Sequence, residues 1–226
     1  MDEPAEMRRA RARMVDHQLR GRDITDRRVL EVMGRVPRHL FLPPEAASAA
    51  YSDMPLPIGQ RQTISQPYIV ALMSQALGLK GDERVLEVGT GSGYQAAVLA
   101  GLAGQVYSLE RLPALAERAR ATLDRLGLRN VEILVADGSG GLPEHAPFQG
   151  IVVTAAAPKP PQPLLDQLAE AGRLVVPVGG MEGQMLERWT RRQGEFECER
   201  VAPVAFVPLV GEFGWRADLR PLPNEE

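Results

Sequence analysis

The stretch that decides the fold is VLEVGTGSG, which runs from Val85 to Gly93. Its first half has the apolar, β-branched composition of a strand, and its second half places glycine at every other position before a helical stretch. Glycine has no Cβ, so the backbone can turn sharply and come close to a ligand. The N-terminus of the following helix offers free N–H groups. Strand, glycine turn and helix in this order predict a ligand site at the end of a strand in an α/β fold.

The glycine spacing and one acidic residue indicate which ligand this turn binds. A dinucleotide fingerprint has the form GxGxxG and places a pyrophosphate at the helix N-terminus, whereas the third glycine here comes one residue early. A carboxylate at Glu87 would repel a phosphate but attract the sulfonium and amino group of S-adenosylmethionine. The pattern therefore favours S-adenosylmethionine over NAD, and a tight turn that binds no ligand is the alternative. The contacts expected from this segment are Glu87, Gly89, Thr90, Gly91, Ser92 and Gly93.

Acidic residues also end the next two predicted strands. Glu110 ends QVYSLE, where its carboxylate can accept hydrogen bonds from both ribose hydroxyls; a solvated charge at a helix start is the alternative. Asp137 and Gly138 follow NVEILVA, where the carboxylate can accept from the adenine amino group; a simple Asp-Gly turn is the alternative. Ligands of open α/β sheets lie across the carboxyl ends of the strands. The strand ends therefore predict one shared cofactor site.

Strands and helices alternate on the C-terminal side of the glycine turn. The expected strands are 84–88, 105–110, 130–137, 150–156 and 173–179, and the expected helices are 94–103, 113–127 and 162–172. Crossover helices between strands imply a mostly parallel sheet with helices on both faces. From Gln184 onward, two strands flank a Gln193-Gly194 turn. They predict an antiparallel element at the sheet edge.

The segment before the glycine turn is predicted to be helical. Apolar positions between Ile24 and Val36 recur at helical spacing. Thr25 or Asp26 is the expected cap of this helix, and Pro37 is expected to end it.

A loop rich in proline and glycine, SDMPLPIGQRQTISQP, leads into a second helix expected over 67–79. We expect a single domain, in which 1–80 form an N-terminal helical attachment and loop and 81–226 form the α/β core with its C-terminal strands.

Composition and charge exclude several classes of protein. The chain has 226 residues, of which 44% are hydrophobic and 24% charged, so it is neither disordered nor fibrous. A net charge of -3 argues against nucleic-acid binding through bulk charge. Cys198 is the single cysteine, and the three histidines lie far apart without an HExxH spacing. We therefore expect no internal disulfide and no metal site.

The same features predict where the protein acts. No run approaches the roughly 18 apolar residues of a membrane span, and the N-terminal segment lacks the apolar region of a secretory signal. A chain without disulfides fits a reducing compartment. We expect a cytoplasmic monomer that binds neither membrane nor nucleic acid.

Six segments resemble, in order, the signature blocks of the protein-L-isoaspartate O-methyltransferase family in its bacterial form. They are SDMPLPIGQRQTISQPYIVALM, VLEVGTGSGYQAAVLA, NVEILVADG, APFQGIVVTAAAP, GRLVVPVG and VAFVPLV, and they span about Met14 to Val210. The glycine block is shared by many methyltransferases that use S-adenosylmethionine, whereas IGQRQTISQP has no counterpart in ordinary ones. The resemblance implies a Rossmann-like class I S-adenosylmethionine-dependent methyltransferase.

The resemblance also implies a reaction. Members of the family transfer a methyl group to the free α-carboxylate of L-isoaspartyl residues in damaged proteins and peptides, leaving S-adenosylhomocysteine. The ester then closes to a succinimide without enzyme, and hydrolysis returns some normal aspartate. The implied function is repair of aged proteins.

The segment Thr63-Ile64-Ser65 is the candidate clamp for the acceptor carboxylate. A carboxylate has a pKa of about 4, so it is anionic near neutral pH and needs no general base. The Ser65 hydroxyl and neighbouring N–H groups can hold one carboxylate oxygen while the other attacks. The family resemblance implies that Ser65 is catalytic, and Thr63 and Ile64 are predicted to contact the cofactor. The alternative, which spacing alone favours, is that Ser65 only caps the helix that starts at Pro67.

The sequence departs from the family pattern at three positions. Arg61 stands where bacterial relatives usually have glycine, Ala136 replaces the first glycine of a GDG, and Gln149 replaces an aspartate. Arg61 matters most, because its charge lies in the expected substrate loop. Two other functions compete with repair: methylation of a small molecule or RNA by the same fold, and cofactor binding without turnover. The substrate-loop block argues against the first, and Glu87, Glu110 and Ser65 argue against the second.

Overall fold

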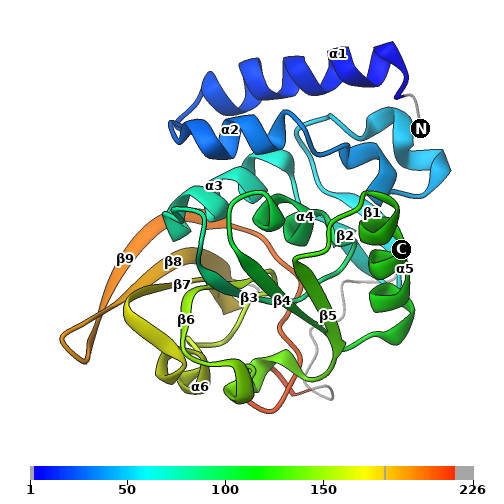
Figure 1. Cartoon of the computed structure of the whole chain (residues 1–226). Helices are drawn as coiled ribbons and strands as arrows, with labels where there is room; N and C mark the ends of the chain where they lie inside the picture. Colours follow the sequence, from blue (N-terminus) through cyan, green and yellow to red (C-terminus); the bar gives the residue numbers. More distant parts are fainter. Residues whose placement is uncertain (1–2, 181, 217–226) are drawn as a thin grey trace.

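The computed structural model describes residues 3–180 and 182–216. Its centre is a seven-stranded sheet in the order β5-β4-β3-β6-β7-β8-β9 (Figure 1). The strands are β3 (Arg84–Val88), β4 (Gln105–Glu110), β5 (Val131–Val135), β6 (Phe148–Val153), β7 (Leu168–Gly180), β8 (Gly183–Arg192) and β9 (Glu195–Val204). The first five pair in parallel and the last two are antiparallel. This confirms the predicted mostly parallel sheet with an antiparallel edge.

Helices cover both faces of the sheet because its parallel strands need crossover connections. The connecting helices are α4 (Tyr94–Ala100), α5 (Pro113–Arg125), α6 (Gln162–Asp166) and the short η4 (Gly138–Gly140) and η5 (Pro143–His145). Successive strand residues point to opposite faces. Val85 therefore packs in one core with α4 and α5, whereas Leu86 packs in a second core with α6 on the other face.

The antiparallel edge is a long hairpin of β8 and β9 (Figure 1). Gln193 and Gly194, at its tip, have φ of 53° and 84°. A two-residue turn with both φ values positive matches the right-handed twist of the flanking strands. The structure thus confirms the hairpin that the Gln193-Gly194 pair predicts.

The N-terminal part is a helical layer that packs beside α4 (Figure 1). It consists of α1 (Ala5–Arg13), the π-helical η1 (Met14–Arg20), α2 (Arg27–Met33), η2 (Arg38–Phe41), η3 (Pro44–Ala49) and α3 (Pro67–Leu77). Of the two expected caps, Asp26 is the one that caps α2: its carboxylate accepts from the N–H groups of Arg28 and Val29 at 2.9 and 3.3 Å.

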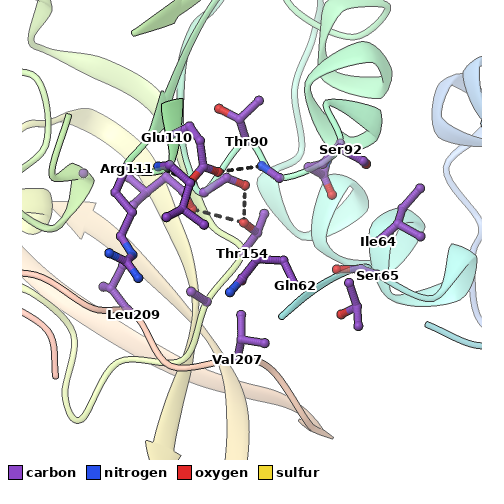
Figure 2. A pocket seen from close by; sticks show the side chains of 18 of the residues that line it. Gln62, Ile64, Ser65, Thr90, Ser92, Glu110, Arg111, Thr154, Val207 and Leu209 are labelled. Atoms are coloured by element: carbon purple, nitrogen blue, oxygen red, sulfur yellow. Dashed lines mark hydrogen bonds between the residues drawn. The ribbon is translucent and has the colours of Figure 1, made fainter. Parts of the chain in front are cut away.

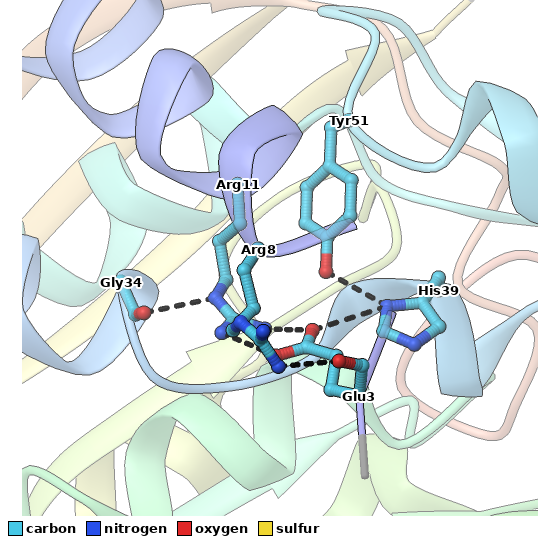
Figure 3. Close-up of polar contacts among 6 residues, drawn as sticks. All are labelled: Glu3, Arg8, Arg11, Gly34, His39 and Tyr51. Atoms are coloured by element: carbon cyan, nitrogen blue, oxygen red, sulfur yellow. Dashed lines mark hydrogen bonds and ion pairs between the residues drawn. The ribbon is translucent and has the colours of Figure 1, made fainter. Parts of the chain in front are cut away.

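The start of this layer is fixed by a polar cluster (Figure 3). The Arg11 guanidinium donates to both carboxylate oxygens of Glu3, at 2.5 and 2.8 Å, and to the carbonyl of Gly34 at 2.8 Å. His39 Nδ1 lies 3.7 Å from the Glu3 carboxylate and 2.9 Å from the Tyr51 hydroxyl. These contacts join Glu3 and α1 to the segment that leads toward the substrate loop.

The proline- and glycine-rich loop contains regular structure that its composition does not predict. Residues 56–64 form a two-stranded hairpin of β1 (Leu56–Gly59) and β2 (Gln62–Ile64). Its turn residues Gln60 and Arg61 have φ of 55° and 54°. Non-glycine residues with positive φ are uncommon. The Gln60-Arg61 pair therefore gives no turn signal of the Asn-Gly or glycine-rich kind.

The helix expected over 162–172 is shorter than predicted. It ends at Asp166, and β7 begins at Leu168, which pairs with Phe148 of β6. The Gln167 side chain accepts from the N–H of Leu142 at 2.7 Å and donates to the carbonyl of Gly140 at 2.8 Å. These tertiary hydrogen bonds fix the end of the helix, and local helix propensity does not reveal them.

No helix within 3–180 and 182–216 is both long and apolar enough to cross a membrane.

Candidate active site

A cavity lies at the carboxyl ends of β3, β4 and β6, where the predicted site residues meet (Figure 2). The sheet contributes the glycine loop after β3, the residues after β4, and Thr154 after β6. The hairpin segment 61–65 and the C-terminal segment 207–210 contribute the rest of the wall. Of the predicted residues, the lining includes Thr63, Ile64, Ser65, Gly89, Thr90, Gly91, Ser92, Glu110 and Gly138.

Gly89 is the position in the loop where glycine is required most clearly. Its φ is 100°, and a Cβ placed there would lie 2.3 Å from the Thr154 hydroxyl oxygen. That hydroxyl donates to the carbonyls of Gly89 and Val88. Any side chain would therefore separate β3 from β6 at the edge of the cavity.

Glu110 shapes the glycine loop as well as facing the cavity. One carboxylate oxygen accepts from the Gly91 N–H at 2.8 Å, and the other accepts from the Leu112 N–H at 2.9 Å. Its side chain is buried, with 6% of the residue exposed. The two N–H groups keep the carboxylate at the tip of β4, where hydroxyl groups of a ligand can reach its free lone pairs.

The hairpin brings Ser65 to the cavity without using it as a helix cap. Gln66 holds the N-cap position of α3, and no side chain caps that helix. The capping alternative for Ser65 is therefore not what the structure shows. Thr63 is exposed and Ile64 is 3% exposed, so Ile64 anchors the clamp segment in the core, and both residues line the cavity.

A second cavity adjoins the first along this segment. Thr63, Ser65, Thr154 and Val207 line both cavities. Its other walls come from the loop before β1, from α3, and from the chain between Pro203 and Phe206. The clamp segment thus borders both cavities.

Glu87 lies outside the lining of both cavities. It is 0% exposed and pairs with Ser108 in the β3–β4 register, so its side chain lies in the core between sheet and helices. The Ser108 hydroxyl donates to it, and Ser108 also shares a 2.5 Å hydrogen bond with Thr90, which does line the first cavity. Burial raises the pKa of the Glu87 carboxyl to about 8, against the lowering effect of the Ser108 hydrogen bond. The direct contact with a sulfonium expected of Glu87 is therefore not what this geometry offers.

The Asp137 carboxylate is also engaged away from the cavity. It accepts from the N–H and hydroxyl of Ser139 at 2.9 and 2.7 Å, and from the N–H of Glu212 at 2.8 Å. Burial would raise the pKa of Asp137, but these hydrogen bonds outweigh it and lower the pKa. Gly138 lines the cavity in its place, and Asp137 ties the C-terminal segment to the site.

Gly93 supports the loop from behind. It is the N-cap of α4 with φ of 86°, and a Cβ there would lie 3.0 Å from the Ala119 Cβ on α5. Its role in this geometry is close packing of loop against helix, and it is not among the described residues that line the cavity.

The sequence matches one family over nearly its whole length. Residues 9–214 match the family model for protein-L-isoaspartate(D-aspartate) O-methyltransferase. The chain belongs to this family. A protein-L-isoaspartate O-methyltransferase from Methanoculleus marisnigri is 54% identical over 214 residues, covering 95% of this chain and 97% of that protein. Protein-L-isoaspartate O-methyltransferase 1 from Syntrophobacter fumaroxidans is 58% identical over 207 residues, covering 92% and 97%.

Solved structures support the same conclusion for the fold. The structure of a candidate protein-L-isoaspartate O-methyltransferase from Plasmodium falciparum, in complex with S-adenosyl-L-homocysteine, is 27% identical in sequence to this chain, with a TM-score of 0.75. The alignment covers 87% of this chain and 96% of the Plasmodium falciparum chain. The fold is that of the class I S-adenosylmethionine-dependent methyltransferases.

The residues present fit S-adenosylmethionine, the cofactor of this methyltransferase family. The first cavity combines a close-approach glycine loop, a buried carboxylate at a strand tip, and the apolar side chains of Leu109, Leu112 and Leu209. The backbone N–H groups and the carboxylate suit the polar groups of S-adenosylmethionine, which include its ribose hydroxyls. The apolar walls suit its adenine ring. Within the described parts of the chain, no cluster of three His, Cys, Asp or Glu residues could hold a metal ion.

Sequence reasoning missed several lining residues. Arg111, Leu112, Gln62, Val70 and Ala155 all line the first cavity. Arg111 and Leu112 follow the strand-end Glu110 directly, so their position at a carboxyl strand end was a usable signal. Gln62 and Val70 depend on how the hairpin folds back over the sheet, which no local pattern specifies.

Proposed function

We propose that the protein transfers a methyl group from S-adenosylmethionine to the free α-carboxylate of L-isoaspartyl residues in damaged proteins and peptides. The product ester then closes to a succinimide, which starts repair. The observation that carries this proposal is the clamp segment Thr63–Ser65, because its Thr63 and Ser65 line both cavities. One cavity has the features of a cofactor site, and we assign the other to the acceptor peptide.

The proposed cofactor contacts follow from the first cavity. The Gly89–Ser92 loop approaches the cofactor with its backbone, and the Glu110 carboxylate accepts from the ribose hydroxyls. Gly138 borders the adenine end, and Thr63 and Ile64 close the site from the hairpin side. Glu87, Gly93 and Asp137 act behind the lining, by supporting the loop and the C-terminal segment.

Ser65 is the proposed catalytic residue. The acceptor carboxylate is already anionic near neutral pH, so no side chain has to remove a proton from it. The Ser65 hydroxyl and neighbouring N–H groups hold one carboxylate oxygen by hydrogen bonds. The other oxygen, kept free of hydrogen bonds and of water, points toward the first cavity.

Methyl transfer then needs alignment more than acid–base chemistry. The cofactor, when bound, supplies an electrophilic methyl group on a positive sulfur. Ser65 and the neighbouring N–H groups would hold the carboxylate so that its free oxygen faces that methyl group, which would pass to the oxygen while the bonding electron pair stays on sulfur. Orientation of this kind contributes several kcal/mol, up to about 7–11 in favourable cases.

We further propose that the chain acts as a cytoplasmic monomer built as one domain, without nucleic-acid or membrane partners. A single exposed cysteine, a net charge of -3 and packing of the N-terminal layer into the same core as β3 support this organisation.

A comparison of two classes of macromolecule as methyl acceptors tests the proposed function. The full-length protein is incubated with labelled S-adenosylmethionine and either aged bulk protein or RNA. We expect label in the protein as an ester that mild base releases. Label in RNA, or base-stable label in protein, would contradict the proposal.

A further inference from the structure

Thr154 is the residue through which the central sheet borders both cavities (Figure 2). Four described residues line the two cavities together. Thr63 and Ser65 belong to the clamp segment, Val207 belongs to the chain after β9, and Thr154 directly follows β6. A group that passes from one cavity to the other therefore passes beside the Thr154 side chain.

The hydroxyl proton of Thr154 is already used by the glycine loop. The hydroxyl donates to the carbonyl of Gly89 at 2.5 Å, and the carbonyl of Val88 lies 3.2 Å away. A threonine hydroxyl has one hydrogen to donate and two lone pairs that can accept. Thr154 therefore faces a ligand as an acceptor, with its donor hydrogen turned toward the end of β3.

The hydroxyl oxygen is held in this place by the surrounding backbone. The Thr154 N–H donates to the carbonyl of Val88 at 2.9 Å, which continues the pairing of β6 with β3. A Cβ on Gly89 would lie 2.3 Å from the oxygen, so the oxygen occupies space that only glycine leaves open. Within residues 3–180 and 182–216, no N–H or O–H group donates to this oxygen, and its lone pairs stay available.

The cofactor and its product differ at the group that passes between the cavities. S-adenosylmethionine carries a methyl group on a positive sulfur, whereas S-adenosylhomocysteine has a neutral thioether there. A fixed oxygen lone pair attracts a nearby positive charge, and water screens this attraction less in a cavity than in bulk solvent. The C–H groups of a methyl on positive sulfur are polarised, so they also form weak hydrogen bonds to oxygen. The neutral thioether offers neither interaction.

We propose that the Thr154 hydroxyl sets the preference of the site for the charged cofactor over the neutral product. This inference rests on the proposed function, because that function places the methyl group between the two cavities. The attraction disappears once the methyl group has left, since the sulfur is then neutral. Thr154 thus favours exchange of the product for new cofactor and does not lower the barrier to transfer.

Binding measurements without an acceptor test this preference. Isothermal calorimetry gives the Kd of S-adenosylmethionine, of S-adenosylhomocysteine, and of sinefungin, an analogue with a charged amino group in place of the methyl-sulfonium. Thr154→Val keeps the shape of the side chain and removes the hydroxyl. We expect it to weaken the two charged ligands about fourfold relative to S-adenosylhomocysteine. Thr154→Ser keeps the hydroxyl and should keep the parent ratios.

Thr122→Val is the matched control. The Thr122 hydroxyl is buried on α5 and also donates to a backbone carbonyl, that of Arg118 at 3.0 Å. Thr122 lines neither cavity. The same substitution there should leave the ratios of the three Kd values as in the parent protein.

Two outcomes would overturn the inference. Equal weakening of all three ligands by Thr154→Val would mean that the hydroxyl only supports the glycine loop. Unchanged ratios together with a raised KM for an isoaspartyl peptide would mean that the hydroxyl binds the acceptor instead. The proposed function is tested separately, because the ratios need no acceptor: a parent protein that methylates no isoaspartyl peptide would refute that function whatever the ratios are.

Discussion

The Glu110 carboxylate both holds the glycine loop in place and faces the cofactor cavity. It holds the Gly91 and Leu112 N–H groups, and it lines the first cavity. Each oxygen has a second lone pair that these N–H groups do not use. The residue is thus placed to bind hydroxyls without any rearrangement of the loop.

Replacing Glu110 by alanine should weaken S-adenosylmethionine binding by about 1–3 kcal/mol, because the ligand hydroxyls and the loop N–H groups lose their acceptor. Isothermal calorimetry measures this change. Glu117→Ala, on the exposed face of α5, is the matched control. Unchanged affinity in a folded Glu110→Ala protein would place the ribose contact elsewhere.

Ser65→Ala should lower turnover by about 10- to 100-fold while cofactor affinity stays close to that of the parent protein, because the lost hydroxyl orients the acceptor. Thermal stability should change little, since Gln66 is the N-cap of α3. Single-turnover kinetics and a melting curve measure the two effects, with the exposed Ser52→Ala as control. Normal turnover combined with a lowered melting temperature would mean that Ser65 has only a structural role.

Glu87 makes stability depend on pH. Its folded-state pKa of about 8 lies above its ordinary value of 4.5, so between these pH values the unfolded chain loses a proton that the folded protein keeps. The free energy of unfolding should therefore fall as pH rises from about 4.5 to 8.

Glu87→Gln mimics the neutral carboxyl and should remove this slope. We expect the variant to be more stable than the parent by on the order of a few kcal/mol at pH 8 and equal to it near pH 4. Urea unfolding across the pH range measures the difference. Cofactor affinity should stay near the parent value. A large loss of affinity would show that Glu87 contacts the cofactor.

At the scale of elements, hydrophobic patterning predicts the strands best. The boundaries of β3 and β4 agree with the predicted 84–88 and 105–110. Both strands are buried and bounded by turn residues, so their limits are local properties of the sequence. The hairpin of β1 and β2 and the early end of α6 depend on tertiary contacts such as those of Gln167, which local patterns do not contain.

The cap of α2 allows a test at this scale. Asp26→Ala should lower the free energy of unfolding by about 1 kcal/mol, because the Arg28 and Val29 N–H groups lose their acceptor. Asp26→Asn, which can still accept, should cost much less. Equal losses for both variants in denaturant titrations would assign the effect to charge instead of capping.

At the scale of the whole molecule, the site depends on how distant segments meet. The strand ends at Gly89, Glu110 and Gly138 were predictable, because a parallel sheet brings its carboxyl strand ends to one edge. The positions of Glu87 and Asp137 were not, since strand register and the C-terminal segment decide where their side chains lie. The contact of Thr63 and Ser65 with both cavities arises only when the hairpin reaches the carboxyl ends of the strands.

The central claim is that the clamp segment positions one particular carboxylate. In an isoaspartyl residue the free carboxylate is attached directly to the α-carbon, whereas the carboxylate of normal aspartate lies one methylene further from it. A misplacement of about 1 Å can cost on the order of 100-fold in rate.

Paired peptides of identical sequence, one with L-isoaspartate and one with L-aspartate, test this claim most directly. Both are incubated with the full-length protein and labelled S-adenosylmethionine. We predict that base-labile label enters the isoaspartyl peptide and barely enters the aspartyl peptide. Equal labelling of the two peptides would contradict the account.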